Sequence, residues 1–283
     1  MDRQAIPIVH VCLLAFLVCI TLSRVQGSEN ALDKIFTDYA DILRAHVDNQ
    51  GMVSYKDLSA DPGKLDAFAQ QLATLDRPTF DKWNDSERIA FWINAYNGLT
   101  LKAIIDNYPI EASWTVSLRF PNNSIRQIPG VWNRLKFSIM GRAMTLDEIE
   151  HGILRNEFDE PRIHMALVCA AMGCPPLRNE PYIGSILDQQ LDDQAKRFLS
   201  NQAKFSIDHE RQIVYLSSIF KWFRKDFAKT YGGDERFSNY GASERAVLSF
   251  ISRYIGESNS TLLAGETIYR INYLDYDWSL NEQ

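Results

Sequence analysis

The sequence has few cysteines and, beyond its first 27 residues, no apolar run long enough to span a bilayer. It contains four cysteines in 283 residues, and two of them fall within the N-terminal apolar stretch. Only Cys169 and Cys174 remain after it. Two cysteines cannot form a multi-bridge disulfide scaffold, so they allow one bridge, one corner of a metal site or one reactive thiol.

An excess of basic residues is also missing. Thirty Lys and Arg residues face 36 Asp and Glu residues, which gives a net charge of −6 at pH 7. Since nonspecific nucleic-acid binding depends on neutralising phosphates, we expect no nucleic-acid partner. The chain has no internal repeat, Walker loop, dinucleotide fingerprint, Gly-x-Ser-x-Gly elbow or His-Glu-x-x-His motif, and we expect no cofactor.

The N-terminus has the three parts of a secretory signal. Arg3 gives a short positive region, Ile6–Leu22 is almost wholly apolar, and small residues precede Ser28. We therefore predict that residues 1–27 are a signal peptide and that 28–283 form a single globular domain, secreted or periplasmic. The alternative is an uncleaved N-terminal membrane anchor, although the strongest apolar run is shorter than the roughly 20 residues of a typical span.

The remaining pattern predicts an α+β fold, mostly helical, with a small and predominantly antiparallel sheet. A helix predicted from Asp85 or Ser86 to about Asn107 is apolar nearly all round, which is typical of a helix at the centre of a domain. Asn94 and Asn97 lie on this helix, and polar groups there must be hydrogen-bonded. Residues 205–208 and 213–216 are predicted to pair as a hairpin.

A second helix begins at the capping box formed by Thr145 and Glu148 and continues to Arg155. The helical period puts Glu150 close to the inner face of this helix. It puts His151 nearly opposite. Glu150 is therefore the expected buried carboxyl group, whereas His151 must meet another element or solvent.

The densest group of reactive residue types follows this helix. Ile163–Cys169 is predicted to be an apolar strand, and Cys174 with two prolines ends any regular structure after it. His164 and Cys169 have opposite parity, so an unbroken strand would point their side chains to opposite faces. They converge only if the strand ends or bulges before Cys169.

Three interpretations of this group remain open. The first is a thiol-dependent active site, because a cysteine attacks only as its thiolate and needs a base or a positive neighbour. Its candidate residues are Cys169 or Cys174 as nucleophile, His151 or His164 as base, and Asn94, Asn97 or Glu150 as the group that orients the imidazole. The second is a metal site, which the Cys-x4-Cys spacing without a second close pair disfavours. The third is structural: a Cys169–Cys174 disulfide or two buried thiols.

Several separated motifs together resemble the family called domain of unknown function 547 (DUF547), in matching order over roughly residues 30–281. These motifs are Phe91-Trp-Ile-Asn94-Ala-Tyr96-Asn97, Leu146-Asp-Glu-Ile-Glu150-His151-Gly-Ile-Leu-Arg155, His164-x-Ala-Leu-x-Cys169 with Cys174-Pro-Pro, Phe220-x-Trp222 through Asp226-Phe227, and Tyr276-Asp277-Trp278-x-Leu280-Asn281.

The resemblance implies no catalytic activity, cofactor or substrate. It implies that Cys169 belongs to the motif of the fold and that Cys174 is optional. Our leading hypothesis from the residue types is a thiol-dependent hydrolase or acyltransferase, and the alternative is a non-catalytic binding or structural domain with a Cys169–Cys174 disulfide. Export favours the alternative, because an oxidising compartment promotes bridging of a nearby cysteine pair.

Overall fold

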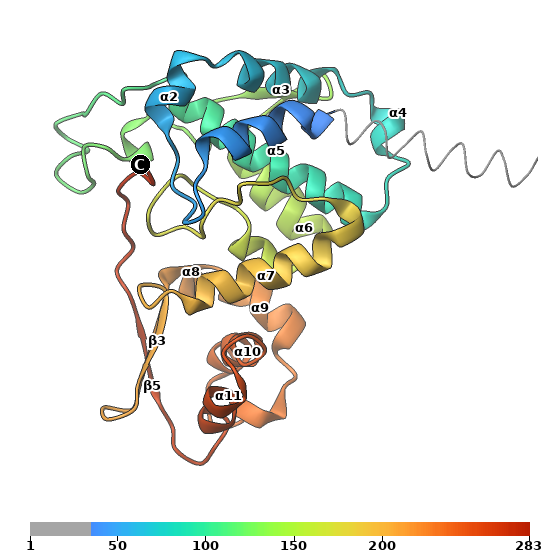
Figure 1. Ribbon diagram of the computed structural model, residues 1–283. Helices are drawn as coiled ribbons and strands as arrows, with labels where there is room; N and C mark the ends of the chain where they lie inside the picture. Colours follow the sequence, from blue (N-terminus) through green and yellow to red (C-terminus); the bar gives the residue numbers. More distant parts are fainter. Residues whose placement is uncertain (1–34) are drawn as a thin grey trace, which may run out of the picture.

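The computed structural model describes residues 35–283 (Figure 1). The predicted signal peptide, residues 1–27, lies outside the described residues. Residues 35–46 are helical. The helices that follow are α2 (Tyr55–Ala60), α3 (Gly63–Thr74), α4 (Arg77–Phe80), α5 (Asp85–Ile105), α6 (Arg155–Glu157), α7 (Leu187–Ser200), α8 (Ser218–Trp222), α9 (Arg224–Tyr231), α10 (Ala242–Ile251) and α11 (Glu257–Leu263). The strands are β1 (Phe137–Ile139), β2 (Arg142–Met144), β3 (Phe205–Asp208), β4 (Ile213–Leu216) and β5 (Arg270–Tyr273).

The mostly helical α+β class is confirmed. Helices contain 50% of the residues and strands 9%, and the strands form two small sheets. In one sheet β1 pairs with β2 antiparallel; in the other β3 pairs antiparallel with β4, as the predicted hairpin requires, and β5 adds in parallel to β4. Among residues 35–283, none of the helices has the length and apolarity that crossing a membrane would require.

Helix α5 lies at the centre of the N-terminal half, where α2, α3 and α7 pack against it (Figure 1). It is buried nearly all round, as predicted. Its cap is Asn84, not Asp85 or Ser86: the Asn84 side chain accepts from Glu87 N–H, and the Glu87 carboxylate accepts from Asn84 N–H. This reciprocal box satisfies two of the donors that a helix start leaves unpaired.

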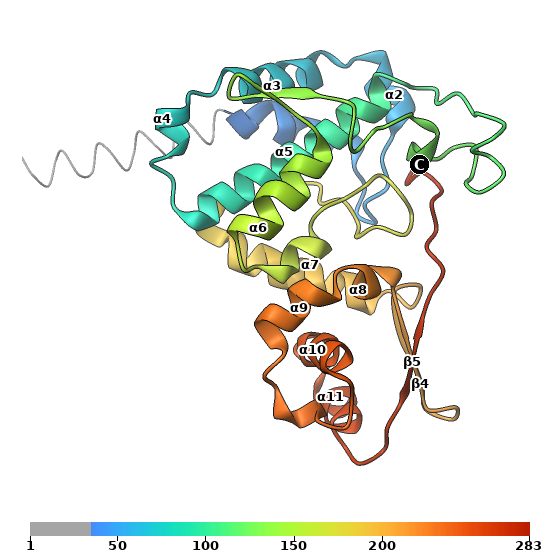
Figure 2. The same ribbon diagram turned by 180° about the vertical axis from the view of Figure 1, so that it is seen from behind.

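The C-terminal part packs around a second apolar cluster, formed by α8 to α10 and the inner face of the β3–β4–β5 sheet. After β5 the chain leaves this cluster and runs the length of the molecule to the N-terminal half (Figure 2). There Leu280 pairs with Ala171, and Glu282 pairs with Val53. The last residues thus connect the two clusters, and the segment between them, residues 274–279, passes along the site described next.

Candidate functional site

The predicted helix that carries Glu150 and His151 is a π-helix, Glu148–Leu154, which continues into α6. The capping box is confirmed: Thr145 N–H donates to Glu148 at 2.7 Å, and Glu148 N–H donates to the Thr145 hydroxyl at 3.2 Å. Glu150 is 9% exposed. The side chain of His151 is 46% exposed. The predicted division between an inner carboxyl group and an outer imidazole is therefore confirmed.

Glu150 is a carboxyl group with little access to water. Burial raises the pKa of Glu150 to about 7, because desolvation penalises the charged form. The hydroxyl of Tyr96, on α5, hydrogen-bonds this carboxyl group and partly opposes the shift. Burial, followed by the nearby Glu150 charge, raises the pKa of Tyr96 well above its ordinary value, so Tyr96 remains a hydrogen-bond donor. Near neutral pH, Glu150 can therefore both give and take a proton.

The His151 imidazole lies beside this carboxyl group, with Nδ1 3.8 Å from Glu150 Oε1. Burial and the neighbouring Arg155 charge lower the pKa of His151, so the ring is neutral near pH 7. Arg155 lies 3.0 Å from Nδ1 and has only donors to offer. Nδ1 is therefore the acceptor, which assigns the proton of the neutral ring to Nε2.

His164, by contrast, is buried, on the 3-10 helix Pro161–Met165, and stacks on Phe223 with ring centroids 3.8 Å apart. Its Nε2 lies 2.7 Å from Asp226 Oδ2. Burial lowers the pKa of His164 and the hydrogen bond to Asp226 offsets only part of this effect, so the neutral ring donates Nε2–H.

Asp226 also pairs with Arg155 through two hydrogen bonds, at 2.6 and 3.0 Å. Burial would raise the pKa of Asp226, but the hydrogen bonds from His164 and Arg155 outweigh it and hold the pKa well below its usual range. Arg155 thereby links the two histidines, because it also contacts His151.

The predicted strand at Ile163–Cys169 is wrong. The segment is a 3-10 turn followed by irregular chain, and Ala170 has a left-handed φ of 58°. Asn97 explains the difference: its side chain accepts from Val168 N–H at 2.8 Å and donates to the Ala166 carbonyl at 2.9 Å. The backbone here is satisfied by an amide on α5 and needs no partner strand.

Cys169 and Cys174 form a disulfide at the end of this segment. Tyr276, from the C-terminal segment, places its hydroxyl 3.2 Å from Cys169 Sγ and 3.0 Å from Cys174 Sγ. The hydrogen-bond partner of the Cys169 sulfur is thus a tyrosine, and in this state the sulfur is not a thiol. Among residues 35–283, no group of three His, Cys, Asp or Glu side chains is arranged to hold a metal ion.

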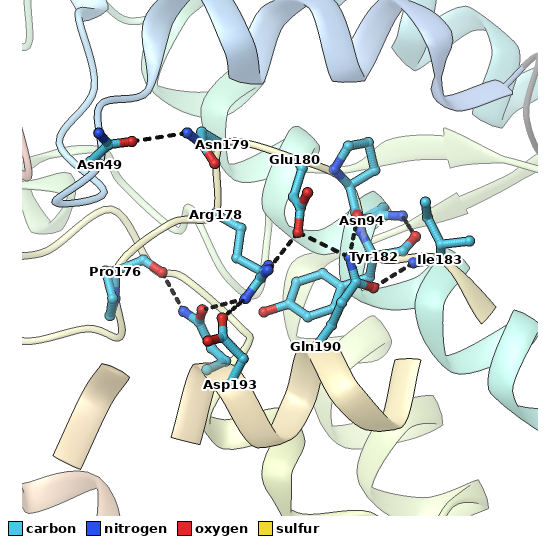
Figure 3. A network of polar contacts seen from close by, with 12 residues as sticks. Asn49, Asn94, Pro176, Arg178, Asn179, Glu180, Tyr182, Ile183, Gln190 and Asp193 are labelled. Carbon is cyan, nitrogen blue, oxygen red and sulfur yellow. Dashed lines mark hydrogen bonds and ion pairs between the residues drawn. The ribbon is translucent and has the colours of Figure 1, made fainter. Parts of the chain in front are cut away.

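Asn94 is directed away from the histidines. Its amide pairs with both the N–H and the carbonyl of Tyr182, at 2.9 and 2.8 Å (Figure 3). In the same network Gln190 accepts from Ile183 N–H, and Arg178 pairs with Glu180 and Asp193. Asn94 and Asn97 therefore both hold loops onto the buried helix, which is the hydrogen bonding that their position on α5 required.

Five of the candidate side chains share one cavity of about 600 Å³, namely those of Glu150, His151, His164, Cys169 and Cys174. Its walls are aromatic, with Phe120, Trp132, Trp222, Phe223, Tyr276 and Trp278 among the lining residues. Apolar, aromatic walls around a few convergent polar groups are typical of a small-molecule site.

Sequence reasoning missed several residues of this site. Tyr96, Arg155, Asp226 and Tyr276 all lie inside the motifs quoted for the family resemblance, and that membership was the available signal. Arg126, which also lines the cavity, lies in none of those motifs. Two of its ring neighbours, Phe120 and Trp132, are six residues away, but the third, Trp278, comes from the far end of the sequence.

Comparison with known proteins gives one match. The family described as "Protein of unknown function, DUF547" matches residues 80–199, which confirms the resemblance read from the motifs. The matched region includes α5, the π-helix and the disulfide. No curated protein and no solved structure matches the chain.

Proposed function

On the premise that the chain belongs to the DUF547 family through residues 80–199, we propose that its aromatic cavity is the active site of a hydrolase or group-transfer enzyme. The observation that carries the proposal is Glu150. A buried carboxyl group whose pKa is about 7 faces the cavity beside a neutral imidazole. A proton-transfer group works best when its pKa lies near the working pH, and such shifts concentrate at functional sites.

In the proposed reaction Glu150 is the general base. Its carboxylate removes a proton from water or from an acceptor hydroxyl, and that oxygen attacks the substrate. His151 donates Nε2–H to the oxygen on which negative charge develops, as a neutral imidazole can. Glu150 then returns the proton to the leaving group, so the enzyme ends in its starting state. Arg155 contacts His151 directly and is itself held by Asp226, which His164 also hydrogen-bonds, so these three residues position His151.

The test is a comparison of Glu150→Gln with wild type on chromogenic 4-nitrophenyl esters, phosphates and glycosides. General base catalysis contributes on the order of 10²–10⁴ in rate, so Glu150→Gln should lose at least about a hundredfold in kcat/KM. Glu157→Gln is the matched control, because Glu157 is an exposed carboxylate on the adjoining helix. Wild-type kcat/KM should rise with pH to a plateau, with a midpoint near 7.

An active wild type whose rate survives Glu150→Gln would refute the proposed base. A protein that binds ligands in the cavity yet turns over nothing in this panel would favour the non-catalytic alternative, in which the disulfide and the buried polar residues only stabilise the fold.

A second candidate is the thiol-dependent hydrolase or acyltransferase. Cys169 supports it, because its sulfur lines the same cavity as the two histidines. The disulfide must first be reduced: an external dithiol would be oxidised while Cys169 and Cys174 become thiols. Iodoacetamide labelling of the reduced protein tests this, since an activated Cys169 should react well below the ordinary thiol pKa of about 8.5. An unreactive Cys169 would exclude it.

Export is the remaining part of the proposal. A signal peptide at residues 1–27 would deliver the chain to an oxidising compartment, and the Cys169–Cys174 disulfide supports that destination. Mass spectrometry of protein recovered from the periplasm or medium should find a chain that starts at Ser28. A full-length chain that stays in the cytosol would contradict export.

A further inference from the structure

Arg126 lines the same cavity and is held there by its neighbours. It lies in the short 3-10 helix Ile125–Gln127, where its N–H donates to the Ser124 hydroxyl. The adjoining Gln127 is buried and fixes the preceding loop: it accepts from Ser113 N–H at 2.9 Å and donates to the Pro121 carbonyl at 3.0 Å. The backbone under Arg126 is therefore set before any ligand arrives.

The guanidinium group of Arg126 lies against three aromatic rings. Its central carbon is 4.4 Å from the ring centre of Phe120, 4.9 Å from that of Trp278 and 5.3 Å from that of Trp132. Cation–π contacts hold a cation in place but leave its N–H donors free. Within the part of the chain that the structure describes, no carboxylate pairs with this guanidinium.

This arrangement differs from that of Arg155 and Arg178, which both pair with carboxylates. Arg126 is instead a partly desolvated cation whose planar fork of donors faces a cavity. Such a fork matches a carboxylate, sulfonate or phosphate group, which it binds through two parallel hydrogen bonds.

The rings connect Arg126 with the proposed proton-transfer group. Trp278, which contacts Arg126, lies 4.6 Å from Tyr276, centre to centre. Tyr276 in turn touches the disulfide and lines the same cavity as Glu150. A ligand anchored at Arg126 would therefore share one cavity with the rings of Trp278 and Tyr276 and with Glu150.

We infer that the cavity selects an organic anion: a small molecule with an apolar or flat body, whose carboxylate, sulfonate or phosphate group is bound by Arg126. This inference rests on the proposed function for which part of the ligand reacts at Glu150. Binding of the anionic group by Arg126 does not depend on that function. It narrows the preferred substrates of the site to acidic compounds, which should bind more tightly than neutral analogues of the same shape.

Two fluorescent compounds with the same ring system test this directly. 1-Anilinonaphthalene-8-sulfonate carries a sulfonate, and N-phenyl-1-naphthylamine lacks it. We expect wild type to bind the sulfonate at least about tenfold more tightly, and Arg126→Gln to lose at least about tenfold for the sulfonate alone, the lower end of the range for one hydrogen bond to a charged group. Arg119→Gln is the matched control, because Arg119 is exposed on the same connection and does not line the cavity.

Competition by 2-naphthoate, 2-naphthyl phosphate and 2-naphthol then shows which anion is preferred and should leave the neutral naphthol weakest. Equal loss of both fluorescent compounds in Arg126→Gln would overturn the inference, since Arg126 would then only support the aromatic wall. So would unchanged sulfonate binding. Failure of the proposed function would look different. In that case Glu150→Gln would keep its activity, and the preference for the sulfonate conferred by Arg126 would persist.

Discussion

At the scale of single residues, the surroundings of each carboxyl group in the site decide whether it is ionised at neutral pH. Glu150 is acidic by name but is half protonated near pH 7, whereas Asp226 remains ionised because Arg155 and His164 both hydrogen-bond it. The two carboxyl groups are therefore suited to different tasks. Glu150 can exchange a proton, and Asp226 holds a fixed charge that positions the histidines.

The first prediction concerns the stability cost of ionising Glu150. Since the pKa of Glu150 is raised on folding, wild type should lose stability as pH rises from about 4.5 to about 7 and lose no more above it. Glu150→Gln cannot ionise, so we expect its Tm to match wild type at pH 4.5 and to exceed it by roughly 10 °C at pH 8.5. Differential scanning calorimetry across pH measures this. A constant difference at all pH values would contradict it.

The second prediction concerns the Asp226 carboxylate. Asp226→Asn should lower the free energy of unfolding by about 2–3 kcal/mol at pH 7, because it leaves Arg155 without its charge partner in a half-buried site. Asp159→Asn is the control, since Asp159 pairs with Lys229 on the surface and should cost less than about 1 kcal/mol. Urea unfolding compares the two variants. Equal effects would show that the buried network adds nothing beyond a surface ion pair.

At the scale of elements, α5 organises the site from beneath. It supplies Tyr96 to Glu150, and its two asparagines hold the chain segments on either side of the disulfide. Gly98 permits α3 to pack closely against α5, because a Cβ at that position would lie 2.2 Å from a Phe68 ring carbon. The helix is therefore both the centre of the core and the support on which the cavity is built.

The third prediction tests how α5 begins. Asn84→Ala removes the acceptor for Glu87 N–H and should lower the free energy of unfolding by about 1 kcal/mol, the usual value of a helix N-cap. Asn84→Asp keeps an acceptor and should recover most of it. Urea unfolding with unchanged m-value is the measurement. An Ala variant as stable as wild type would mean that the cap contributes nothing to this buried helix.

At the scale of the whole molecule, the C-terminal segment joins the two apolar clusters and completes the site. It follows β5, contributes Tyr276 and Trp278 to the cavity, and ends against α2 and the turn before it (Figure 2). Asn281 is buried there, accepting from the Tyr55 hydroxyl at 2.7 Å and donating to the Gly51 carbonyl at 3.1 Å. The aromatic wall of the cavity thus depends on the contacts that hold Asn281 in place.

The fourth prediction follows from that anchor. Asn281→Ala should lower the free energy of unfolding by about 2 kcal/mol, because it leaves the buried hydroxyl of Tyr55 unpaired. It should also weaken 1-anilinonaphthalene-8-sulfonate binding, since Trp278 and Tyr276 lose their fixed position. Gln283→Ala, two residues later, removes only exposed hydrogen bonds to the Met52 and His46 carbonyls, so it should cost about 1 kcal/mol or less and leave binding unchanged. A destabilised Asn281→Ala variant with wild-type binding would separate the anchor from the cavity.

Local patterns were sufficient wherever a feature depends on neighbours in sequence. Apolar periodicity predicted α5, a capping box predicted the start of the Glu150 helix, and strand patterning predicted the β3–β4 hairpin, because each depends on contacts a few residues apart. The cap of α5 itself was not predicted, since it is Asn84 and not Asp85 or Ser86. The motifs between residues 80 and 199 were also sufficient to predict the match to the DUF547 family model.

Only the tertiary structure decided the chemistry of the site, because its partners come from distant parts of the chain. It replaced the predicted strand at residues 163–169 with loop, since Asn97 on α5 supplies the hydrogen bonds of a partner strand. It also brought Arg126, Glu150, the disulfide and Trp278 around one cavity. By itself the sequence determined that α5 and the Glu150 segment are helical and which of their side chains are buried; the pKa of Glu150 and the open donors of Arg126 were decided by what packs around them.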